Sequence, residues 1–172
     1  MIKNILIATC IAAIAAVGGS LVHPLGALDA PPNDRTILHE AQIDLETLAI
    51  VQRACQNCHS QNTEWPWCGR IAPISWLLSH DVQQARAHMN LSQWQDYPTD
   101  DRRRLLSEIG SAVRNREMPV QRYLILHPEA RLTAIEGQQL CQWTRTERSR
   151  LRHSIAAPNS TNATLPFTAS SQ

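Results

Sequence analysis

Cys55, Cys58 and His59 form the pattern C-x-x-C-H within the stretch CQNCHSQNTEWPW. Two cysteines and a histidine at this spacing can bind zinc, exchange electrons as a thiol pair, or hold a haem. Residues three positions apart share a helix face, so each thiol can reach a vinyl group of the same porphyrin. His59 then lies where its imidazole can bind the iron. The pattern therefore predicts one covalently attached haem c per chain.

The remaining cysteines bear on the competing interpretations. A structural zinc site needs four ligands, normally in two closely spaced pairs, whereas Cys68 and Cys141 each stand alone. A redox-active thiol pair of the thioredoxin type normally follows a strand, whereas a helix is predicted before this motif. A disulfide within the motif would leave its histidine unexplained. In an oxidising compartment, a disulfide between Cys68 and Cys141 remains an open alternative.

Met118 is the main candidate for the sixth iron ligand. It precedes Pro119 in a loop, where proline can orient the backbone so that the thioether points inward. A methionine between the third and the last predicted helix is where a small cytochrome places its distal ligand. Three histidines could supply a nitrogen ligand instead: His80, His88 and His127.

Hydrophobic periodicity predicts four helices that position these residues, at 40–54, 73–89, 100–115 and from Thr133 to about residue 150. Thr99 is expected to cap the third helix, and Thr133 with Glu136 forms a capping box for the last. The expected buried stripes are Leu45, Leu48, Val51 and Cys55 in the first helix and Leu105, Ile109 and Val113 in the third. We see no strand pattern, so the predicted fold is all-α.

The two ends of the chain differ from its centre. Lys3 precedes an apolar run, ILIATCIAAIAAV, that small residues follow, which is typical of an export signal cut after Gly19 or Ala27. An uncleaved membrane anchor over residues 5–22 is the alternative. The expected organisation is a signal or anchor at 1–27, a linker at 28–39, a haem domain at 40–153 and a disordered tail at 154–172.

The charge balance excludes one class of partner. Lys3 is the only lysine among the 16 basic residues, so a chain cut after Ala27 keeps 15 arginines against 15 acidic residues. A nucleic-acid-binding protein would carry a basic excess, and we therefore expect no nucleic-acid partner.

Two longer strings resemble the haem-binding domain family of exported c-type cytochromes. They are CQNCHSQNTEWPWCGRIAPISWLLSHDV and EMPVQRYLILHPEARLTAIEGQQLCQW. The resemblance implies a small c-type cytochrome-like bundle of about four helices wrapped around one haem. It implies haem attachment at Cys55, Cys58 and His59, with Met118 as the distal ligand. It also makes Trp65, Trp67, Pro73 and Trp76 haem-pocket or core residues. Cys68 departs from the family pattern, which leads us to expect an aromatic residue there.

These features predict a monohaem c-type cytochrome that transfers electrons in the periplasm or an equivalent lumen. No residue at convincing spacing for bond-making catalysis is evident, and the redox partner is unknown. The alternative is a peroxidase-like haem enzyme, or a gas or redox sensor, with a labile sixth ligand; Arg116 or His80 would then serve on the distal side. A zinc-stabilised interaction module is the third hypothesis, kept because Cys68 is otherwise unexplained.

Overall fold

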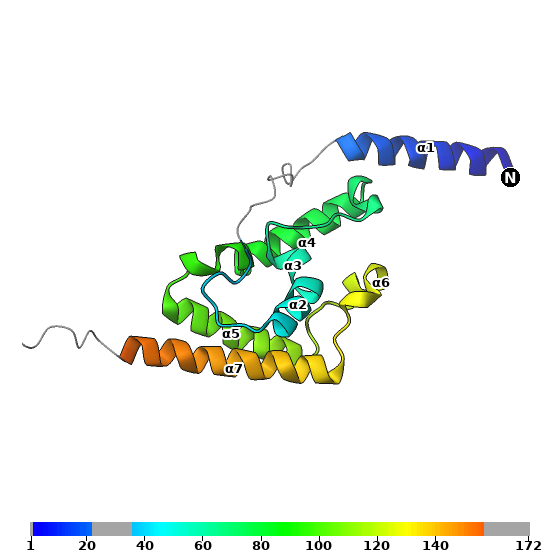
Figure 1. Cartoon of the computed structure of the whole chain (residues 1–172). Helices are drawn as coiled ribbons and strands as arrows, with labels where there is room; N and C mark the ends of the chain where they lie inside the picture. Colours follow the sequence, from blue (N-terminus) through cyan, green and yellow to red (C-terminus); the bar gives the residue numbers. More distant parts are fainter. Residues whose placement is uncertain (1, 22–35, 157–172) are drawn as a thin grey trace, which may run out of the picture.

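The computed structural model describes residues 2–21 and 36–156, and every regular element within them is helical (Figure 1). The α-helices are α1 (Ile2–Leu21), α2 (Leu45–Ala54), α3 (Gln56–His59), α4 (Ile74–His88), α5 (Thr99–Arg114), α6 (Tyr123–Leu126) and α7 (Ala134–Ala156). Three 3-10 helices lie between them: η1 (Trp67–Arg70), η2 (Leu91–Asp96) and η3 (Pro128–Ala130). The predicted all-α fold is confirmed. The four predicted helices are α2, α4, α5 and α7, whereas α3 and α6 are too short for a periodic pattern to reveal.

Helix α2 begins later than the sequence indicated. Asp44 caps it, because one carboxylate oxygen accepts from the backbone N–H of Thr47 at 2.8 Å and the other accepts from the Thr47 hydroxyl at 2.7 Å. Of the predicted stripe, Val51 is buried, and Leu48 and Cys55 are partly buried against the core, whereas Leu45 is 84% exposed. Thr47, Ile50 and Ala54 are buried as well. The prediction that Leu45 is a core residue was wrong: it is the first residue of the helix, next to the Asp44 cap, and its side chain is exposed.

Caps were predicted at the N-terminal ends of α5 and α7. The capping box of α7 is confirmed: the N–H of Glu136 donates to the Thr133 hydroxyl at 3.2 Å, and the N–H of Thr133 donates to the Glu136 carboxylate at 2.8 Å. Thr99, in contrast, is the first residue of α5, and Pro98 occupies the cap position without a side-chain hydrogen bond. A proline fits there because the first N–H groups of a helix need no intrahelical partner.

The core lies where α5 and α7 pack along each other (Figure 1). At this contact Gly110 of α5 approaches α7 so closely that an added Cβ would lie 2.8 Å from the Thr144 hydroxyl oxygen. Of the predicted α5 stripe, Leu105 is buried, and Ile109 and Val113 are partly buried against the core. The buried cluster comprises Ile37, Leu38, Ile50, Val51, Met89, Leu91, Trp94, Leu105, Leu106, Leu140, Trp143 and Leu151.

Helix α1 is exposed along nearly its whole length and meets the rest of the chain near its C-terminal end. There the Ser20 hydroxyl accepts a hydrogen bond from the N–H of Ala72 at 3.0 Å, and Gly19 lies against Ala72 and Trp76. Residues 2–20 are long and apolar enough to cross a membrane, and a signal sequence has the same properties. The apolar helix thus fits a signal or an anchor.

Some predicted boundaries fall beyond what the structure describes. The second cleavage point, after Ala27, lies outside the described residues, as do residues 28–35 of the linker and 157–172 of the tail. Helix α7 continues to Ala156, past its expected end near Arg150 and past the expected start of the tail at Ser154.

Candidate functional site

The C-x-x-C-H motif lies where α2 ends and α3 begins. The backbone N–H of Cys55 donates to the carbonyl of Val51, and the N–H of His59 donates to the carbonyl of Cys55 at 3.0 Å. Helical hydrogen bonding therefore continues into the motif, with a change of direction at Cys55, whose φ is −125°. As predicted, the helix before the motif carries Cys55 at its end, with Cys58 one turn further on.

Both motif cysteines are free, partly buried thiols. Burial, followed by the neighbouring Cys58, raises the pKa of the Cys55 thiol to about 12. Burial and then the carboxylate of Asp81 also raise the pKa of Cys58. Redox-active thiols have lowered pKa values, because the thiolate is the attacking species. The raised values therefore disfavour a thiol-exchange function for this pair.

The ring of His59 is oriented by the backbone at the end of α4. Its Nδ1 lies 3.2 Å from the carbonyl oxygen of Met89. A carbonyl only accepts hydrogen bonds, so Nδ1 must carry the hydrogen. Burial lowers the pKa of His59, which favours the neutral imidazole. A neutral ring with its hydrogen on Nδ1 has a free lone pair on Nε2, the arrangement that a metal-binding histidine needs.

The loop after the motif is tied to α4 and η2. Arg86 donates through Nε to the Ser60 carbonyl at 2.7 Å and through a terminal nitrogen to the Thr63 hydroxyl at 2.8 Å. The Ser92 hydroxyl accepts from the N–H of Gln61 at 3.1 Å. Ser60 is completely buried. Sequence reasoning missed Arg86, because no spacing pattern connects α4 to this loop.

Asn57, between the two cysteines, connects the motif to α6. Its side-chain amide donates to the Tyr123 hydroxyl at 2.9 Å, and its side-chain oxygen accepts from the N–H of Glu64 at 3.1 Å. Arg122, which precedes α6, forms a two-pronged ion pair with Asp81 of α4 at 2.9 and 2.8 Å. These contacts hold α6 beside α3 and α4. Neither Asn57 nor Tyr123 carried a sequence signal of its own.

Both helices next to the motif carry exposed apolar side chains. Ile74 and Leu77 of α4 are 42% and 52% exposed, and Ile125 and Leu126 of α6 are 78% and 52% exposed. A porphyrin ring needs apolar surface, two thiols at the attachment points and an imidazole nitrogen for the iron. The motif region offers all three kinds of group. Its residues therefore fit a covalently attached haem.

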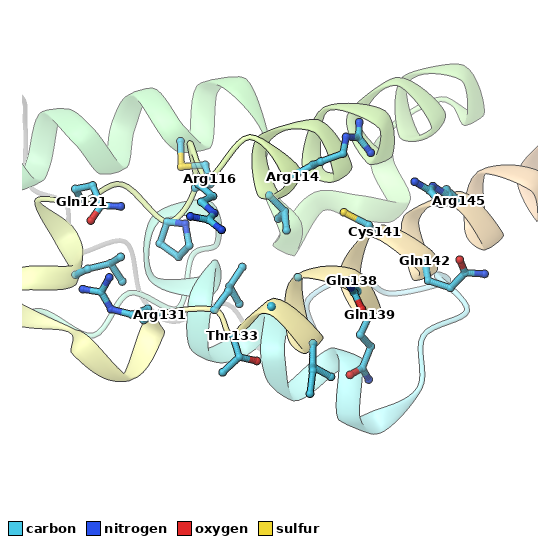
Figure 2. A pocket seen from close by; sticks show the side chains of 18 residues that line it. Arg114, Arg116, Gln121, Arg131, Thr133, Gln138, Gln139, Cys141, Gln142 and Arg145 are labelled. Carbon is cyan, nitrogen blue, oxygen red and sulfur yellow. The ribbon is translucent and has the colours of Figure 1, made fainter.

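Met118 is one of the residues that line an open groove of about 890 Å³, which Figure 2 shows from close by. It follows α5 in a loop, where its N–H donates to the Ala112 carbonyl at 3.4 Å, and it is 42% exposed. We call this groove the arginine groove, because four arginines line it. Its lining residues include Arg114, Arg116, Gln121, Arg131, Cys141 and Arg145. Cys55, Cys58 and His59 do not line it. The role of Met118 as the sixth ligand stays a prediction.

The three alternative histidines lie on the surface or near it. His80 is exposed on α4, and Nε2 of His88 pairs with Glu108 at 2.9 Å. His127 stacks on Tyr123, with ring centroids 4.3 Å apart, and its Nδ1 contacts Glu129 at 3.1 Å. After burial, the nearby His88 also contributes to the lowered pKa of His59. Tyr123, on which His127 stacks, accepts the hydrogen bond from Asn57 of the motif. Arg116, the alternative distal residue, lines the arginine groove with Met118.

Cys68 and Cys141 are both free, which contradicts the alternative of a disulfide between them. Cys68 is buried in η1, whereas Cys141 lies in α7 and its thiol contacts the Gly110 carbonyl at 3.4 Å. The two side chains thus belong to different parts of the fold. Within the described ranges, no three His, Cys, Asp or Glu side chains group as they would around a metal ion.

The expected pocket tryptophans differ in exposure. Trp67 is 83% exposed, so it is not a core residue. Trp76 is 37% exposed and lies against Gly19 at the end of α1. Trp65 is partly buried in the loop after the motif. The large fully buried ring is instead that of Trp94 in η2, which the family resemblance did not indicate.

Comparison with known proteins gives one match. A family model described as a haem-binding domain matches residues 18–146. This range contains the motif, Met118 and all four arginines of the groove. No curated protein and no solved structure matches the chain.

Proposed function

We propose, from the premise that the chain belongs to the haem-binding domain family, that it is a monohaem c-type cytochrome. Cys55 and Cys58 would hold the haem through thioether bonds, and His59 would bind the iron. The bound haem supplies one-electron chemistry. The chain's own residues hold the cofactor, orient its ligands and tune its potential.

The orientation of His59 is the observation that carries this proposal. The carbonyl of Met89, 3.2 Å from Nδ1, fixes both the tautomer and the plane of the ring. Such a hydrogen bond from the non-binding nitrogen makes an imidazole a more basic ligand. His59 also follows directly after two unpaired thiols, Cys55 and Cys58. A core histidine with a purely structural role would not need this combination.

Electron transfer is proposed for the bound cofactor, with Met118 as the sixth ligand. A thioether is a soft, neutral ligand that favours ferrous over ferric iron and so raises the potential. The loop that contains Met118 joins α5 to α6, and the N–H groups of Glu117 and Met118 tie it to α5 by donating to the Ala112 carbonyl.

One observation favours the alternative, a haem enzyme or gas sensor with a labile sixth ligand. Met118 is 42% exposed and lines a groove that the motif residues do not share. A ligand held this way would exchange more readily than one buried in the core. Among the residues that line this groove, Arg116 is the polar one nearest to Met118 in sequence.

Transfer outside the cytoplasm is also part of the proposal. The support is the apolar helix α1, which has the length and composition of a signal or an anchor. Covalent attachment of haem takes place outside the cytoplasm in bacteria, so an export segment and a C-x-x-C-H motif belong together. Whether Ile2–Leu21 is removed or retained does not change this compartment.

The proposal is tested with the full chain, expressed with its own leader in a host that attaches haem to exported proteins. We expect the mass to exceed that of the polypeptide by one haem, and haem to remain with the chain on a denaturing gel. Reduced and oxidised visible spectra should show a low-spin haem with the methionine-to-iron charge-transfer band. Complete extraction of the haem by acid–acetone would contradict covalent attachment. Immediate binding of carbon monoxide would favour the sensor or enzyme.

A further inference from the structure

The arginine groove concentrates positive charge in a chain that is nearly neutral overall. Arg114, Arg116, Arg131 and Arg145 reach it from α5, from the loop after α5, from the segment before α7 and from α7. In the part of the chain that the structure describes, their guanidinium groups have no ion pair and no hydrogen bond, and none of the lining residues is acidic. Other arginines do pair with carboxylates: Arg53, Arg102, Arg103, Arg104, Arg122 and Arg150.

Arg116 occupies a backbone position that normally selects glycine. Its φ is +58°, in the left-handed region. The N–H of Arg116 donates to the Val113 carbonyl and that of Glu117 to the Ala112 carbonyl, the hydrogen bonds of a Schellman helix end. Glycine is favoured at this position because it has no Cβ. The chain has an arginine there at a cost in stability, which points to a use for the side chain.

The groove is long rather than round. Along α7 its lining residues run from Ala134 to Arg145, and at 1.5 Å per residue this is about 16 Å. Figure 2 shows Arg131 and Gln121 at one end and Arg114 and Arg145 toward the other. A single small anion cannot contact arginines spread in this way. An extended peptide of about five residues has the matching length, at roughly 3.3 Å per residue.

We propose that the arginine groove binds an extended acidic segment of a partner protein, about five residues long. Guanidinium groups donate paired hydrogen bonds to carboxylates, and three glutamines in the wall, Gln121, Gln138 and Gln142, can bond to the peptide backbone. Because Met118 is in the same wall, the bound partner lies beside the proposed sixth ligand. That the partner is the electron donor or acceptor rests on the proposed function, whereas the recognition of acidic residues does not.

Pentaglutamate is the probe, titrated at low ionic strength into the exported, haem-loaded full chain, with pentaglutamine as the uncharged control. The variant Arg116→Gln with Arg131→Gln should weaken pentaglutamate binding at least about tenfold. The matched variant Arg70→Gln with Arg103→Gln removes the same charge outside the groove and should change binding less than about twofold. Pentaglutamine should bind to none of them.

Arg116→Gly separates a binding role from a structural one. Glycine adopts the left-handed backbone conformation without strain, so the melting temperature should rise. The guanidinium is lost, so pentaglutamate binding should weaken. A fall in melting temperature together with unchanged binding would overturn the use that we assign to this side chain.

Three further outcomes would overturn the proposal. The first is an equal loss of binding in the groove variant and its matched control, and the second is citrate binding as tightly as pentaglutamate. The third is a loss of haem or an altered visible spectrum in the groove variant, because the arginines would then hold the carboxylates of the cofactor itself. Failure of the proposed function looks different: a chain without covalent haem that still binds pentaglutamate contradicts the cytochrome and leaves the groove site intact.

Discussion

The two halves of the helical domain are built differently. Where α5 and α7 pack along each other, Leu105, Leu106 and Leu140 are at most 1% exposed. Around the motif, α3 has no buried residue, and its neighbours α4 and α6 carry exposed apolar side chains. Polar contacts hold this second region, among them the Asn57–Tyr123 hydrogen bond and the pairing of Arg122 with Asp81.

This difference in packing indicates which parts of the fold depend on the cofactor. Long amphipathic helices bury enough apolar surface to be stable by themselves, whereas elements of four residues do not. The α5–α7 pair should therefore stay folded without haem. In the motif region, bound haem would supply the apolar contacts that α3 and α6 lack on their own. The following predictions test this contrast, from the largest expected effect to the smallest.

Removing both attachment points should affect the two regions unequally. In the double variant Cys55→Ala, Cys58→Ala we expect complete loss of covalent haem, because no other thiol lies next to His59 in sequence. Amide hydrogen exchange should become faster in α3, α6 and the start of α4, and should change little in α5 and α7. Mass spectrometry measures both the haem and the exchange.

The matched control is Cys68→Ala with Cys141→Ala, which removes two thiols outside the motif and should leave haem content unchanged. Uniform loss of protection through α5 and α7 in the motif variant would show that the domain folds as one cooperative unit. The contrast between the regions would then be wrong.

Met118→Ala should change the iron without changing the packing of the domain. We expect a high-spin spectrum, loss of the methionine-to-iron band and rapid binding of carbon monoxide, with the haem still covalently attached. Met118→His should restore six ligands and lower the potential within the roughly 0.8 V range that axial ligands span. Met89→Leu is the control, because its backbone carbonyl still orients His59. If the band persists in Met118→Ala, another residue is the sixth ligand.

Leu140→Ala tests the self-packed region. Leu140 has no exposed surface, so truncation should lower the free energy of unfolding by about 2–5 kcal/mol. Haem content and spectrum should stay unchanged, since the motif is not involved. Leu45→Ala, at a side chain that is 84% exposed, should change stability by less than about 0.5 kcal/mol. Chemical denaturation measures the unfolding free energy of both variants. A change in the haem spectrum of Leu140→Ala would show that the two regions are coupled.

The start of α7 should show the smallest effect. Thr133→Ala removes the cap and should cost about 1 kcal/mol of unfolding free energy. The hydrogen bond from the Thr133 backbone has the largest effect on the pKa of Glu136 and lowers it. Burial, the next largest effect, raises this pKa, and the Thr133 side chain and Arg53 lower it further, so that the pKa is lowered on balance.

A lowered native pKa means that this carboxylate stabilises the fold above its usual pKa near 4.5. The contribution is lost as the pH falls through the lower native value. Glu136→Gln should therefore reduce the pH dependence of stability below about pH 4.5, measured by thermal melts across that range. An unchanged dependence would show that other carboxylates dominate it.

The sequence alone determined the features that depend on residues close together in the chain. The capping box of Thr133 and Glu136, the bounds of α4 and the all-α fold follow from spacings of three and four residues, because hydrogen bonds and contacts in a helix span these separations. The C-x-x-C-H motif is equally local. The chemistry of Cys55, Cys58 and His59 could therefore be proposed from the sequence.

Tertiary structure alone decided what lies opposite these residues. The carbonyl of Met89 reaches the ring of His59, and Arg86 reaches the Ser60 carbonyl, across separations of 30 and 26 residues. The exposure of Leu45 and the meeting of four arginines in one groove also depend on how the helices pack. A local pattern indicates that a helix has an apolar face. Which partner covers that face is set by the packing of distant segments, which no spacing along the chain encodes.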